Sequence, residues 1–328
     1  MKRLPFIALF IYSLLTALLA ATGPAAAAQV LFHDGVAGVP SVVTVGEDDS
    51  LIEMAREYDM GYDEMVAANP GVDPILPPPG TLVVVPGSWI LPDVPKKEGI
   101  VINLSDMRLY YFTPPKSAWV ETFPVGIGRE GWDTPLGTYT VIEKIVNPAW
   151  YVPPSIRQEK PELPEVVPPG PDNPMGSHAL RLSNRFVLIH GTDRPYGIGR
   201  RVSHGCIHLY PEDIVSLFWT VKMKTPVTIV RQPVKAARFE GRVMVEIHED
   251  GEVNLEKEAT ELLQRKGWWG EVDQEKLKAA LASHSGMPVD VTGAGMPKAE
   301  PGGEKEKQKP PEPEAPAGGE GSPDDEEE

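Results

Sequence analysis

Apolar positions change their period several times along this chain, and the first change predicts a small domain. The run "SVVTV" alternates apolar and polar residues, as a half-buried strand does. Apolar residues from Leu51 to Tyr58 then recur at helical spacing behind Asp49 or Ser50, either of which can cap a helix. A second helix fits "YDEMVAANP", and "GTLVVVP" supplies a closing strand. Residues 41–86 are therefore predicted to form a β-α-α-β domain.

Residues 99–232 have a different texture, with short β-type runs divided by Gly and Pro clusters. This pattern predicts a multidomain protein whose largest part is mainly β, a sandwich or barrel. One segment, "YPEDIVSLFWTVKM", has its apolar residues at helical spacing instead, so a helix is expected there, directly after the segment around Cys206.

A proline-rich stretch, residues 147–176, interrupts this domain and cannot pair as a central strand. Loops of that length within a compact domain are usually functional or mobile, so we predict a flap over or beside a site. The alternative is an inert insertion.

Residues 239–291 predict a small α/β extension. "RVMVEIHED" and "EVN" suggest a hairpin, and "LEKEATELLQRK" and "QEKLKAALASH" suggest two amphipathic helices. Trp268 and Trp269 are expected to pack, and His248 and His284 to lie at the surface.

The first residues have the three-part pattern of an export signal. Lys2 and Arg3 precede an apolar run shorter than the ~20 residues of a membrane span, and small residues follow up to Ala28. We expect a signal peptide over residues 1–28, cleaved near Ala28, with a retained signal anchor as the alternative. No later run approaches membrane length, so an exported, soluble protein without a stable membrane span is predicted.

Charge and cysteine usage narrow the function. The formal net charge is −16, and residues 297–328 supply −7 of it, with eleven acidic residues against four lysines. That Pro- and Gly-rich tail is predicted to be disordered. An acidic chain without a basic stripe is a poor candidate for nucleic-acid binding. A single cysteine excludes an internal disulfide, although export would favour one.

The lone cysteine is placed for chemistry. A thiol reacts as thiolate, which needs a base or a positive environment nearby. His190 ends the apolar strand "VLIH", and His204 lies two residues before Cys206 in "RRVSHGCIH". Gly205 permits a tight turn whose amides could face an oxyanion. This context favours acyl transfer over the usual reading of a lone cysteine as a small buried hydrophobe.

A zinc site is the other chemical reading. His204, Cys206 and His208 would share one face if the segment were extended, and with His190 they would supply four suitable ligands. The glycine and the absence of a common zinc spacing argue against it, so no metal or other cofactor is expected.

Two resemblances carry the prediction further. Residues 41–86 resemble a LysM module through "VGED", "AANP" and "PGTLVVVP", which implies binding of glycans such as peptidoglycan; a spacer domain without ligand is the alternative. "HGT" and "SHGC", together with "FPVGIGREGWDTPLGTY" and "NPAWYVPPSIR", resemble the L,D-transpeptidase (YkuD-type) family over residues 99–232. The likeness is greatest to its periplasmic branch, which includes the enzymes that attach the murein lipoprotein to peptidoglycan; this resemblance implies a periplasmic location.

The second resemblance implies an enzyme that acts on tetrapeptide stems of peptidoglycan. A cysteine thioester would form with loss of D-alanine, and an acceptor amine would then give a third-to-third crosslink or an attached protein. It implies that Cys206 is the nucleophile, that His190 is the general base and that the Gly191 carbonyl orients the imidazole. The backbone amides of His204, Gly205 and Cys206 would stabilise the oxyanion. Substrate contacts or loop support are expected from Ser203, Thr192, His208, Arg200 and Arg201.

One position departs from the family pattern. Close relatives usually have Arg where this chain has His208, which replaces a permanent charge and a bidentate fork with a group that is often neutral. Arg200 or Arg201 could compensate. Two alternatives stay open, namely an L,D-carboxypeptidase or amidase using the same site and a non-catalytic peptidoglycan-binding protein.

Overall fold

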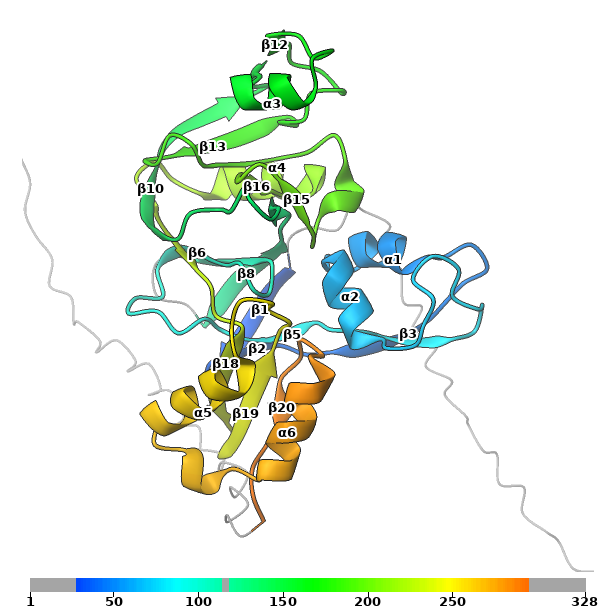
Figure 1. Ribbon diagram of the computed structural model, residues 1–328, viewed down its shortest axis with the longest axis vertical. Coiled ribbons are helices and arrows are strands. Elements are labelled where there is room, and N and C mark those ends of the chain that lie inside the picture. The colour runs from blue at the N-terminus through cyan, green and yellow to red at the C-terminus, as the bar shows by residue number, and fades with distance from the viewer. Residues whose placement is uncertain (1–27, 114–117, 295–328) are drawn as a thin grey trace, which may run out of the picture. The chain divides into compact units, whose positions relative to one another are not determined.

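The structure, a computed structural model, describes residues 28–113 and 118–294. All but the last residue of the predicted signal peptide, and the predicted acidic tail, lie outside the described residues. The described chain is mainly β with a few short helices (Figure 1), which confirms the predicted fold class. None of its helices has the length and apolarity needed to cross a bilayer.

A large sheet of eleven strands runs through most of the described chain. Its strand order is β16-β14-β13-β10-β17-β6-β7-β8-β1-β2-β5. Outside the proline-rich stretch, the elements from β6 to β17 are β6 (Gly99–Asn103), β7 (Arg108–Phe112), β8 (Trp119–Pro124), β9 (Ile127–Gly128), β10 (Gly137–Val146), β13 (His178–Leu182), β14 (Leu188–His190), η1 (Pro195–Gly197), β15 (Arg201–Ser203), β16 (Ile207–His208), α4 (Pro211–Thr220) and β17 (Pro226–Val230). The helix predicted after the cysteine is α4.

The central strands are buried on both faces, which explains their unbroken apolar runs. In β6, Ile100 and Ile102 belong to the core that α4 covers, whereas Val101 faces a second core formed with residues 41–86. The neighbouring strand β7 divides in the same way, with Leu109 in the first core and Tyr110 in the second. One sheet therefore separates two cores.

The N-terminal module (residues 41–86) has the strand-helix-helix-strand order expected from the sequence. β3 (Ser41–Thr44) pairs antiparallel with β4 (Leu82–Val85), and α1 (Leu51–Glu57) and α2 (Tyr62–Ala68) lie between them in the chain. The Ser50 hydroxyl caps α1 by accepting a hydrogen bond from the Glu53 amide.

The module is inserted in the large sheet rather than placed before it. β1 (Ala28–His33) and β2 (Val36–Gly38) precede the module, β5 (Ser88–Ile90) follows it, and all three strands extend the sheet beyond β8. The sheet is thus wider than the predicted range 99–232. β2 and β5 are three-residue strands, too short to show a period of two, so pairing decided their place.

The predicted flap (residues 147–176) pairs only with itself. β11 (Trp150–Tyr151) and β12 (Val166–Val167) form a separate two-stranded sheet, with α3 (Pro154–Glu159) between them. The Asn173 side-chain amide donates to the carbonyl of Pro148, 2.9 Å away, and so ties the two ends of the flap together.

The last described part differs from its prediction. β18 (Val234–Phe239) pairs with β19 (Arg242–Ile247), and β19 pairs with β20 (Val289–Asp290); α5 (Leu255–Arg265), η2 (Trp269–Glu271) and α6 (Gln274–Ser283) complete the unit. The predicted hairpin between "RVMVEIHED" and "EVN" is wrong, because Asn254 caps α5 instead. The unit also begins at Val234 rather than residue 239. Trp268 and Trp269 pack against its core, as expected.

Candidate active site

The cysteine lies in a turn that its own neighbours close. Gly205 has φ of +100°, a conformation that favours glycine, and it joins β15 to β16. The Ser203 hydroxyl donates to the Cys206 carbonyl at 2.6 Å and accepts from the Gly205 amide at 3.1 Å. The Ser203 side chain therefore holds the backbone of both Gly205 and Cys206, which fixes the direction of the turn.

Pairing of β16 with β14 brings this turn to the end of the strand that carries His190. The two strands run parallel with His190 opposite His208, and the Leu209 amide donates to the His190 carbonyl at 2.9 Å. Residues separated by 16 positions in the sequence thus become neighbours. The structure therefore places Cys206, the predicted nucleophile, beside the strand that ends in His190, the predicted base.

The thiol itself is in its neutral form at rest. Burial raises the pKa of Cys206, and a backbone hydrogen bond from Leu188 offsets only part of that rise. The sulfur lies 3.9 Å from the carbonyl oxygen of Phe186. Phe186 was not predicted from the sequence, because this contact depends on the β13–β14 turn meeting the cysteine turn.

His190 has its tautomer set by a backbone carbonyl. Its Nδ1 lies 2.7 Å from the Gly191 oxygen, and since a carbonyl only accepts, Nδ1 must carry the proton. Nε2 is then an unprotonated base. Burial lowers the pKa of His190 to about 4, so the imidazole is neutral near pH 7.

His208 packs directly against that base. The two ring centroids are 4.4 Å apart with the planes at 51°. Burial, and then the neighbouring His190 and His204, lower the pKa of His208 well below its ordinary value. This side chain therefore brings no positive charge near pH 7 to the position where the family resemblance leads one to expect an arginine.

His204 points to a different set of groups. Its ring lies edge-on to Trp132 at 4.8 Å, and its Nε2 is 3.0 Å from the Arg129 guanidinium and 3.4 Å from Glu159 of the flap. Arginine only donates, so the shorter contact makes Nε2 an acceptor. Arg129 and Glu159 were not singled out from the sequence, although Arg129 lies in a segment that resembles the family and Glu159 lies in the predicted flap.

The remaining predicted residues support the loops. Thr192 accepts a hydrogen bond from the Arg194 amide at 2.9 Å. Arg200 lies over the Tyr62 ring of the N-terminal module at 4.9 Å, and Arg201 lies 3.7 Å from Asp133. Both arginines therefore have partners other than His208.

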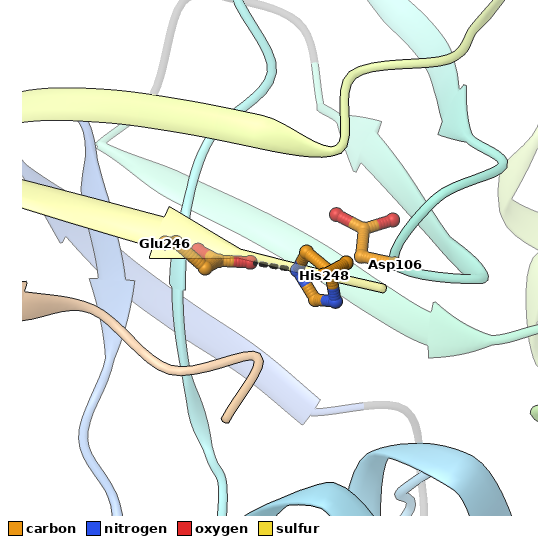
Figure 2. Close-up of side chains that lie close together, drawn as sticks. All are labelled: Asp106, Glu246 and His248. Carbon is orange, nitrogen blue, oxygen red and sulfur yellow. Dashed lines mark hydrogen bonds and ion pairs between the residues drawn. The ribbon is translucent and has the colours of Figure 1, made fainter. Parts of the chain in front are cut away.

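The cysteine segment does not gather metal ligands in the described part of the chain. Within residues 28–113 and 118–294, one group of three or more His, Cys, Asp or Glu side chains has its ligand atoms within 4.8 Å of one another. It consists of Asp106, Glu246 and His248 (Figure 2). Lys235 forms ion pairs with both carboxylates of this group, with its Nζ 2.6 Å from Asp106 and 2.7 Å from Glu246. The ligand set weighed from the sequence is not assembled. His248, expected at the surface, instead lies 2.7 Å from the buried Glu246.

Comparison with known proteins identifies the family. Residues 97–229 match the L,D-transpeptidase (YkuD) catalytic domain. The chain is 40% identical over 265 residues to YcfS, a probable L,D-transpeptidase of Escherichia coli, covering 76% of this chain and 82% of the relative. This chain belongs to the L,D-transpeptidase family. YbiS, another probable L,D-transpeptidase of Escherichia coli, is 41% identical over 77% of this chain and 87% of its own.

Among solved structures, the catalytic domain of an Enterococcus faecium L,D-transpeptidase is similar with a TM-score of 0.33 and 22% identity. The match covers 42% of this chain and 99% of that one. The family makes the protein an enzyme of the L,D-transpeptidase class.

Proposed function

We propose that the protein joins peptidoglycan stems, or a protein, to the wall through a thioester on Cys206. The observation that carries this proposal is the hydrogen bond from His190 Nδ1 to the Gly191 oxygen. It leaves Nε2 as an unprotonated base on the strand paired with the cysteine turn. The same bond orients the imidazole, which a carboxylate does in many other dyads.

In the first half-reaction, the sulfur attacks the carbonyl carbon of the third stem residue, diaminopimelate, while its proton moves to His190 Nε2. The tetrahedral intermediate collapses by breaking the C–N bond. His190 returns the proton to the departing amine, so D-alanine leaves and the thioester remains. In the second half, an acceptor amine attacks the thioester and its proton passes through His190 to the sulfur.

The resting protonation states favour transfer of the proton during attack. A raised thiol pKa and a lowered imidazole pKa together disfavour a preformed thiolate–imidazolium pair. Oxyanion stabilisation is assigned to the amides of His204 and Cys206. The Gly205 amide already donates to Ser203, which argues against its predicted part in that role.

The N-terminal module is assigned glycan binding, which would hold the enzyme on its polymer. Its loop between α2 and β4 exposes Ile75 and Leu76, at 71% and 78%, and Leu82 and Val42 add exposed apolar surface on β4 and β3. Apolar surface of this kind suits the faces of sugar rings. Binding of purified sacculi should fall for Ile75→Ser with Leu76→Ser, whereas Val39→Ser, outside the module and equally exposed, should bind as the wild type does. Equal binding by all three proteins would contradict this assignment. Export to the periplasm and a wall-attached lipoprotein as acceptor complete the proposal.

The central experiment mixes the protein with a disaccharide-tetrapeptide and follows intact mass and free D-alanine, alongside Cys206→Ala. A covalent adduct and D-alanine release by the wild type alone are the expected results. A product joined to water rather than to an amine would indicate an L,D-carboxypeptidase. Neither adduct nor D-alanine, from a folded protein that still binds sacculi, would refute the catalytic proposal and favour a binding protein.

A further inference from the structure

Arg129 lies in a turn that is fixed to the cysteine loop. Its amide donates to the Ser203 carbonyl at 3.0 Å. The turn continues through Trp132 and Asp133, whose carbonyl oxygens lie about 3.5 Å from where a Cβ on Gly205 would stand. The backbone of this turn is therefore fixed against the loop that carries Cys206.

The guanidinium is held in place from behind. His204 Nε2 accepts a hydrogen bond from Arg129 at 3.0 Å, and Trp132 packs edge-on against the His204 ring. His204 is therefore a positioning residue for Arg129, in addition to any role of its backbone amide. The Arg129 side chain stays partly exposed, so a ligand in solvent can reach it.

The group now on Arg129 is a carboxylate from the flap. Glu159, at the end of α3, lies 2.7 Å from Arg129, and the hydrogen bond from Arg129 lowers the pKa of that carboxyl. Exposed pairs of this kind are weak and exchange readily with other anions. Glu159 thus has the chemistry and the accessibility of an internal competitor for a carboxylate ligand.

We propose that Arg129, positioned by His204, binds a carboxylate of the donor stem peptide, and that Glu159 occupies this subsite until substrate displaces the flap. The inference rests on the proposed function, and it names a substrate contact within the same site. It also supplies the guanidinium that His208 does not, from a different element of the fold. Two carboxylates flank the scissile bond, that of the terminal D-alanine and the side-chain carboxylate of diaminopimelate.

Steady-state release from the disaccharide-tetrapeptide tests the proposal in the mature chain. Glu159→Gln removes the competitor and should lower KM about two- to fivefold with kcat unchanged. Arg129→Gln removes the anchor and should raise KM about tenfold or more. The matched control is Glu165→Gln, which breaks the Arg157–Glu165 pair of 2.9 Å in the same flap and should change neither constant.

Charge reversal separates binding from folding. The double variant Arg129→Glu with Glu159→Arg keeps an ion pair between flap and turn but presents no guanidinium on the turn, so KM should rise as it does for Arg129→Gln. Substrates amidated at one carboxylate or the other, followed by mass spectrometry of the released D-alanine or D-alaninamide, identify the source. Amidation of the carboxylate that binds Arg129 should raise the KM of the wild type. The same amidation should leave the KM of Arg129→Gln unchanged.

Unchanged KM in both Glu159→Gln and Arg129→Gln would overturn the proposal, and so would a raised KM in Arg129→Gln that neither amidation reproduces in the wild type. If the wild type releases no D-alanine, the proposed function fails, and binding of the tetrapeptide to Cys206→Ala still tests the subsite. Equal affinity with and without Arg129→Gln in that background would refute it.

Discussion

Replacing Lys235 with methionine should strongly destabilise the protein, because Lys235 neutralises two buried carboxylates. The side chains of Lys235 and Asp106 are 1% exposed and that of Glu246 is 0% exposed. Lys235 Nζ lies within 2.7 Å of both acids and 3.3 Å from the Tyr110 hydroxyl. Methionine keeps the aliphatic packing and removes only the ammonium, so the change isolates the charge.

Breaking one partner from a buried ion pair costs about 3–5 kcal/mol. The lower part of that range applies here, since other donors remain: the Tyr110 hydroxyl donates to Asp106 at 2.8 Å, and His248 and the Ile90 amide contact Glu246. We therefore expect the free energy of unfolding at pH 7 to fall by about 3 kcal/mol. Lys257→Met, at an exposed position on α5, is the matched control and should change little.

Urea denaturation at several pH values measures the loss and tests its cause. In the wild type Lys235 lowers the pKa of Asp106, against the effect of burial, so its stabilisation is present above the ordinary carboxyl pKa and is lost as pH falls below it. In the variant burial raises the pKa of Asp106 without the opposing effect of Lys235, and protonation of that carboxyl relieves the cost. The difference between the two proteins should therefore shrink as pH falls. A variant as stable as the wild type at pH 7, or a difference that widens on acidification, would refute this reasoning.

Four further predictions concern the same framework and the site. Lys235→Ala leaves Asp106, Glu246 and His248 with ligand atoms within 4.8 Å, so Zn²⁺ should raise the urea midpoint of this variant and not that of the wild type; equal shifts would contradict it. Glu64→Ala leaves the buried Arg108 guanidinium without its carboxylate, 2.7 Å away, and should cost about 3–5 kcal/mol, against little change for the exposed Glu57→Ala. Burial lowers the pKa of His190 to about 4 from 6.5, so the unfolded chain binds the extra proton between these values, and stability should fall by about 3 kcal/mol as pH drops through this window; His190→Gln should abolish that component. His208→Arg places a permanent charge beside the site, and iodoacetamide alkylation of Cys206 should shift to lower pH by about one unit; an unshifted profile would show that this position does not set the thiol pKa.

Local patterns in the sequence determined the helices and pointed to Cys206 and His190 as the candidate catalytic pair. Leu51 to Tyr58 and Ile214 to Phe218 carry a period of 3.6 that only a helix buries on one face, so α1 and α4 were predictable. The cysteine turn was predictable for a similar reason, because Gly205 and Ser203 act within three residues of Cys206. His190 was identified through the residue type that cysteine chemistry requires and through the family motif.

Tertiary structure alone decided which distant groups meet. β2 and β5 are too short to show an alternation of apolar and polar residues. Their place in the sheet follows from backbone pairing, of β2 with β1 and of β5 with β2. Glu159 reaches Arg129 across 30 residues, and Lys235 reaches Asp106 across 129, through charge pairing that leaves no periodic trace in the sequence. A sequence records the local preferences of its residues, whereas contacts between charged side chains depend on the path of the backbone between them. The fold class and the candidate nucleophile thus followed from the sequence, whereas the contacts that shift the pKa values of Cys206 and His190 required the folded chain.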